Sequence, residues 1–226
     1  EMTSSLVGSE MCIRDRYINA NSSAISGVIT DGGKFKWDTE KYPGMKDFKK
    51  FGPFAYTAKL RNGLFRNTGA CLSPQNAFYN SIGMETLGLR MERVCDNAKT
   101  LAQFFATEYS DIEVNYPGLA GSKWHDIATE QFGDKFGGII TIRTGNKKRA
   151  FGIIDALKLP LIVSNIGDTK TLVIHPESTL NVHSTQEEKE TAGVFDDLIR
   201  ISVGIEDIDD LIDDFKQAIE SVKDVY

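Results

Sequence analysis

Apolar residues recur at steps of three and four in two long stretches of the chain, and this spacing predicts amphipathic helices. The first stretch begins at Ser73, a good N-cap residue, and Pro74, which suits the first helical position. Gly83 and Gly88 leave open whether one rod or two helices form there. The apolar stripe of the first stretch is Leu87, Met91, Val94, Ala98, Leu101 and Phe105. The stripe of the second, the last helix, is Ile208, Leu211, Ile212, Phe215, Ile219 and Val222.

Residues 198–206, LIRISVGIE, alternate in a way that predicts a strand. The face expected to be buried carries Ile199, Ile201, Val203 and Ile205, and the opposite face carries Leu198, Arg200, Ser202 and Gly204. Two small residues beside Arg200 leave room above that face for a ligand or for another segment. An arginine in a strand more commonly faces solvent, so the spacing alone leaves its role open.

The remaining pattern divides the chain near Glu108. Residues 23–33 predict a strand that runs into a turn, and residues 34–68, which lack a clean period, predict a surface excursion with a short helix. Pro117-Gly118 has the residue order of a type II turn. Helices and strands then follow each other, and together they predict a small two-layer α+β domain: helix 123–132, strand 137–144, helix 146–159, strand 160–167 and strand 198–206.

Composition narrows the class of protein. The chain has 226 residues, of which 41% are hydrophobic and 26% charged, as in ordinary globular proteins. Its net charge of −6 and the absence of a basic run give no electrostatic footprint for nucleic acid. No run approaches the roughly eighteen apolar residues that a membrane span requires. Three widely spaced cysteines form neither a disulfide framework nor a CxxC metal motif, so the cytoplasm is the expected location.

Several segments together resemble one enzyme family. These segments are GACLSPQNAFYNSIGMETLGLRMERVCDNA, YPGL, DALKLPLIVSNIGDTKTLVIHPEST and LIRISVGIEDIDDLIDDF. From Tyr17 to the C-terminus, their content and order are similar to the C-terminal half of the Cys/Met metabolism family of pyridoxal-phosphate (PLP) enzymes. The resemblance implies an α/β fold class: the C-terminal portion of a type I PLP-transferase fold, with the end of the large domain, a long helix and a small α+β domain.

The excursion with DGGKFKW and FGPFAY is similar to the O-acetylhomoserine sulfhydrylase branch of that family. This branch is implied to make homocysteine or methionine from O-acetylhomoserine and sulfide or a thiol, with PLP as the electron sink. A cystathionine γ-synthase or methionine γ-lyase type of member is the alternative within the family. A non-catalytic regulatory or interaction module is the alternative of another class. The resemblance also implies an amino-acid substrate and a homotetramer with active sites shared between subunits.

Two residues take substrate-binding roles from the resemblance. Arg200 matches the family arginine that binds the substrate α-carboxylate, and Ser164 matches a serine that lies beside that carboxylate. A guanidinium is a planar fork suited to two carboxylate oxygens. His175 matches a family His-Pro pair for which we expect a structural turn, whereas His125 and His183 have no partner pattern that suggests metal binding.

The N-terminal segment departs from the family. Arg16 occupies the position of the lysine that forms the Schiff base with PLP in the family. Asp15 replaces the threonine just before that lysine, and Ile13 replaces a serine that binds the phosphate. Ala20 stands where a glycine is usual. Because a guanidinium stays protonated, it cannot supply the neutral amine that imine formation needs. We expect residues 1–16 to be a non-native segment that resembles translated adapter sequence, 17–108 a remnant of the large domain, and 109–226 the small domain. The chain as written is expected to be inactive and to bind no PLP stably.

Overall fold

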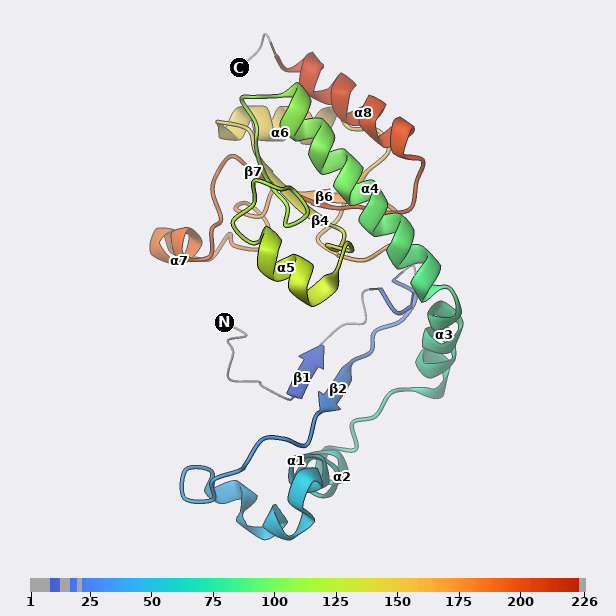
Figure 1. Ribbon diagram of the computed structural model, residues 1–226, viewed down its shortest axis with the longest axis vertical. Coiled ribbons are helices and arrows are strands. Elements are labelled where there is room, and N and C mark those ends of the chain that lie inside the picture. Colours follow the sequence, from blue (N-terminus) through green and yellow to red (C-terminus); the bar gives the residue numbers. More distant parts are fainter. Residues whose placement is uncertain (1–8, 13–16, 20–21, 224–226) are drawn as a thin grey trace. The chain divides into compact units, whose positions relative to one another are not determined.

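The computed structural model describes residues 9–12, 17–19 and 22–223, and the chain forms two compact units (Figure 1). One unit combines Glu1–Asp15 with Ser23–Ile82, and the other combines Arg16–Ser22 with Gly83–Tyr226. The division near residue 108, which the sequence pattern suggests, and the division near residue 16, which the family resemblance suggests, stay predictions.

A strand and a turn form in the first unit where the sequence predicts them. Strand β2 (Val28–Asp31) pairs antiparallel with β1 (Ser9–Cys12). After β2, the Asp31 carboxylate accepts a hydrogen bond of 3.0 Å from the amide of Gly33. Gly33 has a φ of 65°, a backbone conformation that glycine adopts without a steric penalty. The prediction of a strand followed by a turn at residues 23–33 is therefore confirmed.

The excursion at residues 34–68 contains more helix than the sequence predicts. Its segments are η2 (Pro43–Phe54), α1 (Ala55–Lys59), η3 (Leu60–Phe65) and α2 (Arg66–Thr68). Aromatic rings pack together inside it: Trp37 stacks on Tyr56 at 5.6 Å between ring centroids and meets Tyr42 edge-on at 5.5 Å. This small aromatic cluster lets irregular sequence fold into short helical turns.

The long apolar repeat forms two helices rather than one rod. Helix α3 (Pro74–Glu85) begins at the predicted cap, where Ser73 Oγ accepts a hydrogen bond of 3.2 Å from the Asn76 amide. A break at Thr86 separates it from α4 (Leu87–Glu108). The predicted stripe on α4 is confirmed as core, since its buried members are Val94, Ala98, Leu101 and Phe105.

The second unit contains a five-stranded sheet with β7 at its centre. The strands, in spatial order, are β3 (Glu113–Asn115), β4 (Ile139–Arg143), β7 (Leu198–Ser202), β6 (Leu172–Ile174) and β5 (Leu161–Ile162). All neighbours are antiparallel except β5 and β6. Ile199 and Ile201 of β7 are fully buried, as the alternation predicts.

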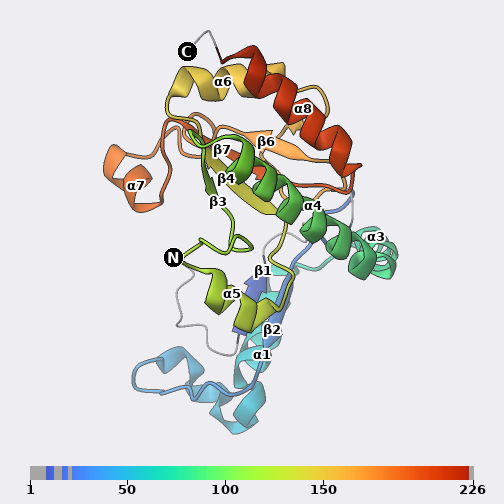
Figure 2. The same ribbon diagram turned by 45° about the horizontal axis from the view of Figure 1, so that its top comes forward.

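Helix α8 (Ile208–Ser221) packs on α4 and on α6 (Lys147–Ala156), and α4 and α6 contact this sheet (Figure 2). The core between them includes an edge-to-face pair, Phe105 of α4 and Phe215 of α8, with ring centroids 5.2 Å apart. Phe215 belongs to the predicted stripe of the last helix, whose members Leu211 and Ile219 are also fully buried. The prediction that these two stripes are core is confirmed for most of their residues.

The turn at Pro117-Gly118 forms, but it is not a type II turn. The Leu119 amide donates to the Tyr116 carbonyl at 3.1 Å, which closes the turn. Gly118 is not among the described glycines with a positive φ, which a type II turn requires at that position. A Cβ on Gly118 would instead collide with the Tyr116 ring, whose hydroxyl donates to the Gly137 carbonyl at 3.0 Å. Glycine is therefore required at position 118 because the Tyr116 ring packs against it, not because of its backbone conformation.

Several elements differ from the sequence prediction. The sequence did not predict β3, and the strand predicted at 198–206 ends at Ser202. The strand predicted at 160–167 is only Leu161–Ile162, because the residues that follow leave the sheet. Strand β6 was not predicted; its three residues are all buried and therefore show no alternation. Helix α7 (Gln186–Thr191) was also missed, although its capping box of Thr185 and Glu188 is readable in the sequence. Helix α5 (His125–Phe132) confirms the helix predicted at 123–132.

A triad of charges ties α6 to α7. Lys147 Nζ and Lys189 Nζ lie 2.8 and 2.6 Å from the Glu177 carboxylate oxygens. The hydrogen bond from Lys147 makes the largest contribution and that from Lys189 the next largest, and they lower the pKa of Glu177 to about 2. Since an unfolded glutamate has a pKa of about 4.3, the stabilisation is complete above that pH and disappears as the pH falls toward 2.

Glu177→Gln is therefore expected to lower the free energy of unfolding by roughly 1 kcal/mol at pH 7 and to have a much smaller effect near pH 2. Urea denaturation at both pH values measures this. Glu130→Gln, an exposed change on α5, is the matched control and should leave stability unaltered at both. Equal stability of Glu177→Gln and the unaltered chain at pH 7 would contradict the role of the triad.

Candidate substrate-binding site

The two residues singled out by the family resemblance meet in the structure. Arg200 lies in the middle of β7, paired with Thr141 of β4 and Ile174 of β6. Its Nη2 donates to the carbonyl oxygens of Ser164 at 2.8 Å and Asn165 at 3.3 Å. The contact uses the main chain of Ser164, a residue that is itself exposed. The arrangement orients a guanidinium at the edge of a loop, and its role in carboxylate binding stays a prediction.

The face of β7 that carries Arg200 is covered by the chain itself. Leu198 and Ser202, on that face, are 8% and 1% exposed. Ser202 Oγ accepts a hydrogen bond of 3.0 Å from the Gly167 amide, which belongs to the same loop as Ser164. The sequence left open whether a ligand or another segment occupies the room beside Arg200. In the structure another segment, residues 164–171, lies there.

A further polar pair joins this loop to the N-terminal segment of the second unit. Ser22 Oγ donates to Asp168 Oδ2 at 3.0 Å, across 146 residues of sequence. Ser22 has a φ of 58°, a left-handed conformation that is uncommon outside glycine. The second oxygen of Asp168 accepts from the Lys170 amide at 3.1 Å, which fixes the carboxylate within its own loop. Sequence reasoning missed this pair, because neither residue lies in a recognisable spacing.

Arg90 anchors the segment that follows position 16. It is 8% exposed, and its donors reach Tyr17 O at 2.7 Å, Gly83 O at 2.7 Å, Ile18 O at 3.4 Å and Thr86 Oγ1 at 3.1 Å. Burial lowers the pKa of Arg90 from its ordinary value, but a guanidinium remains charged at neutral pH. A buried arginine near the start of α4 therefore fixes the main chain of Tyr17 and Ile18, next to the residue that the resemblance matches with the family lysine. The sequence pattern gave no signal for it.

The residue at the lysine position itself lies outside the described part of the chain. Arg16 and its neighbours Ile13, Asp15 and Ala20 fall in the ranges that the structure does not describe. Their consequences for cofactor binding remain predictions from residue chemistry. Tyr17, the first described residue after them, is held through its carbonyl oxygen by Arg90.

Other candidate chemistries find no support among the described residues. No group of three or more His, Cys, Asp or Glu there has the arrangement of a metal site. His175 is buried, with Nε2 2.7 Å from Asp196 O and Nδ1 2.9 Å from Ser178 Oγ, as expected of a structural turn. Burial raises the pKa of the Cys95 thiol, so it is not an activated nucleophile. No helix in the described part is long and apolar enough to cross a membrane.

Residues 13–220 match the family described as Cys/Met metabolism PLP-dependent enzyme. The match covers well over half of the chain. The chain belongs to this family. The members of the family are PLP-dependent enzymes, and they act on amino-acid substrates.

Curated relatives of this family are about twice as long as the chain. The chain is 37% identical over 224 residues to the O-acetyl-L-homoserine sulfhydrylase of Corynebacterium glutamicum. This match covers 92% of the chain and 51% of the relative. It is 37% identical over 218 residues to the homocysteine synthase of Schizosaccharomyces pombe, with coverages of 91% and 51%. The chain thus spans about half the length of the curated relatives it matches.

Solved structures of the family show the same fold. The protein assigned as an O-acetylhomoserine (thiol)-lyase from Campylobacter jejuni superimposes with a TM-score of 0.85 at 31% identity, over 95% of this chain and 54% of that one. The O-acetylhomoserine sulfhydrylase of Wolinella succinogenes gives a TM-score of 0.71 at 36% identity, with coverages of 85% and 52%. The α/β fold of this chain is therefore that of about half of such an enzyme.

The residues that meet at the candidate site do not fit covalent attachment of PLP. The Campylobacter jejuni structure carries PLP joined to a lysine. The described side chains on and beside the loop 164–171 include the Arg200 guanidinium, the Asp168 carboxylate and the Ser22 hydroxyl. None of these three groups is an amine that can form an imine with an aldehyde.

Proposed function

We propose that the chain is the C-terminal portion of an O-acetylhomoserine sulfhydrylase-like enzyme, one that makes homocysteine or methionine from O-acetylhomoserine and sulfide or a thiol. The observation that carries this proposal is the convergence of Arg200 and Ser164, two residues 36 positions apart, in a chain whose curated relatives include sulfhydrylases. Order and content of the family segments from Tyr17 onward support the assignment to the C-terminal portion.

Within this proposal, Arg200 binds the α-carboxylate of the amino-acid substrate. A guanidinium can offer two parallel N–H donors to a carboxylate, and such bidentate pairs fix orientation as well as supply affinity. Because Arg200 Nη2 is held by the Ser164 and Asn165 carbonyls, the fork has a defined direction before a substrate arrives. Ser164 then lies next to the bound carboxylate.

The same proposal predicts that the chain as written is inactive. Arg16 stands at the lysine position, and a delocalised, protonated guanidinium cannot attack the PLP aldehyde. Asp15 adds a negative charge near the place expected for the cofactor phosphate, which repels it.

The absorbance of the purified chain with added PLP tests this prediction. We expect no internal-aldimine band to survive dialysis, and no pyridoxyl group to be fixed to the chain by borohydride. The full-length Corynebacterium glutamicum sulfhydrylase, treated in parallel, is the positive control. A dialysis-resistant band together with a borohydride-stable label on the 226-residue chain would contradict the prediction.

The choice among family activities needs the enzyme encoded by the complete gene. Turnover of O-acetylhomoserine with sulfide or methanethiol supports the sulfhydrylase proposal. Turnover with cysteine as the thiol favours the cystathionine γ-synthase type, and cleavage of methionine favours the methionine γ-lyase type. Co-purification of the unaltered chain with a full-length paralogue, without any turnover, would instead favour a regulatory module.

A further inference from the structure

Alternate residues of the segment 200–206 contact successive points of the loop 164–171. Within β7, side chains two apart project to the same face, so those of Arg200 and Ser202 can follow a loop that runs beside the strand. Gly204 and Glu206 contact the same loop after the strand ends at Ser202. We call these residues, Arg200, Ser202, Gly204 and Glu206, the anchoring row. Arg200 contacts Ser164 and Asn165, and Ser202 contacts Gly167. Gly204 and Glu206 both contact Thr171, and a Cβ on Gly204 would collide with Thr169 and Lys170.

Ser202 holds the middle of the loop. Its hydroxyl oxygen accepts a hydrogen bond of 3.0 Å from the amide of Gly167, and both residues are buried. A buried amide that loses its acceptor retains the full cost of its removal from water. Replacing Ser202 with alanine therefore weakens the loop at one point and leaves the backbone pairing of β7 in place.

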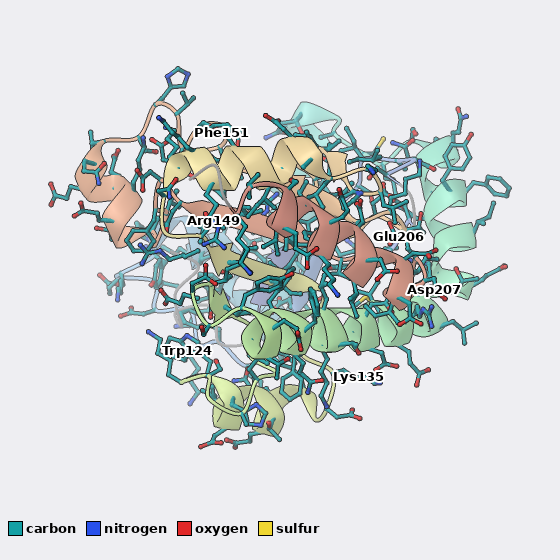
Figure 3. All side chains as sticks on the ribbon, turned by 90° about the horizontal axis from the view of Figure 1, so that it is seen from above. Trp124, Lys135, Arg149, Phe151, Glu206 and Asp207 are labelled. Atoms are coloured by element: carbon teal, nitrogen blue, oxygen red, sulfur yellow. The ribbon has the colours of Figure 1, made fainter. Side chains whose placement is uncertain are left out.

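Glu206 holds the end of the loop. It lies directly before α8 (Figure 3), and its two carboxylate oxygens accept from the amide and from Oγ1 of Thr171. Thr171 Oγ1 also accepts from the Gly204 amide at 3.0 Å, and Thr171 is fully buried. Hydrogen bonds to a charged acceptor are among the stronger ones in proteins. The end of the loop is thus fixed to the residues that follow β7.

Few main-chain hydrogen bonds hold the loop 164–171 in place. The loop is joined to the sheet through Leu161 N to Thr171 O and through Ile205 N to Thr169 O, each at 2.9 Å. Both of these bonds lie at its C-terminal end. The stretch from Ser164 to Gly167 is held by the side chains of Arg200 and Ser202.

We propose that Ser202 and Glu206 are positioning residues for an α-carboxylate site at Arg200. They hold the loop so that the Ser164 carbonyl orients the guanidinium and Asp168 meets Ser22. The ligand class is a small α-amino acid, which the site grips by its carboxylate. This inference rests on the proposed function, since it takes Arg200 as the carboxylate-binding residue.

Hydrogen exchange by NMR on the full 226-residue chain tests the first half of the proposal. In Ser202→Ala we expect the Gly167 amide to exchange roughly fivefold faster or more, and in Glu206→Gln the same for Thr171. The amides of β4 should keep their exchange rates, because general destabilisation would accelerate them as well. Ser110→Ala and Glu130→Gln, exposed changes away from the loop, are the matched controls. Unaltered exchange at Gly167 and Thr171 overturns the proposal.

Titration with O-acetyl-L-homoserine tests whether the site binds an α-carboxylate. The titration is followed by NMR at the amides of residues 164–167. A molecule identical except for a carboxamide in place of the α-carboxylate is the ligand control. We expect the unaltered chain to respond to the carboxylate form alone, and both variants to bind it about threefold more weakly or worse. Faster loop exchange with unchanged affinity overturns the positioning role and leaves the proposed function intact. No carboxylate-dependent response in the unaltered chain contradicts the proposed function and removes the ligand named here.

Discussion

Replacing Gly204 with alanine is expected to destabilise the second unit by about 3 kcal/mol. A Cβ at this position would lie 2.5 Å from the Thr169 carbonyl oxygen and 2.6 Å from the Lys170 carbonyl carbon, and would also collide with the Glu206 carboxylate. Two of these three neighbours are main-chain atoms of the loop 164–171, so they cannot move aside as a flexible side chain would. Urea denaturation followed by circular dichroism measures the loss.

Gly88→Ala is the matched control, and its expected effect has the opposite sign. Gly88 lies in the first turn of α4, and nothing lies within 4 Å of a Cβ there. Alanine in place of glycine within a helix adds up to about 1 kcal/mol of stability. If both alanine variants were as stable as the unaltered chain, the close approach at Gly204 would not be a constraint on the fold.

Removing the Arg90 guanidinium is expected to cost about 3 kcal/mol or more. In Arg90→Leu the carbonyl oxygens of Tyr17, Ile18 and Gly83 lose their shared donor. Gly83 brings this segment close, since a Cβ there would collide with the Ile18 carbonyl and lie 2.7 Å from Asn19 Cα. We expect the amides of residues 17–19 to lose their protection from hydrogen exchange first.

Arg93→Ala, one turn further along α4, is the control for Arg90→Leu. The Arg93 side chain is 48% exposed and its ion pair with Asp207 spans 3.9 Å, so its loss should cost about 0.5 kcal/mol or less. The two arginines differ in burial and in the number of carbonyls they hold, not in charge. Equal costs for the two variants would mean that Arg90 does not hold the segment after position 16.

The first unit presents apolar surface that its own residues do not cover. Ile25 is 78% exposed, Phe54 72% and Phe78 61%, which is unusual for a protein that works as an isolated chain. The expectation that residues 17–108 lack a part of the fold that they normally cover stays a prediction, and such a part would lie against this surface.

The helices and strands with a regular repeat of apolar residues could be predicted from the local sequence. The stripes of α4 and α8 and the inward face of β7 follow from spacing alone, since helix and strand repeats bury every third or fourth and every second residue. The pairing of Arg200 with Ser164 was reachable only through the family resemblance. The three-residue β6 carries no period, and so its position in the sheet could not be read from the chain.

The sequence by itself determined the family, the two core helices and the arginine that the proposed carboxylate site needs. Only the tertiary structure decided three further contacts: the loop 164–171 beside that arginine, the Ser22–Asp168 pair, and the hold of Arg90 on Tyr17. The physical reason is that a periodic signal arises from neighbours within one turn or one pleat. A hydrogen bond between residues 36 to 146 positions apart leaves no such repeat in the chain that makes it.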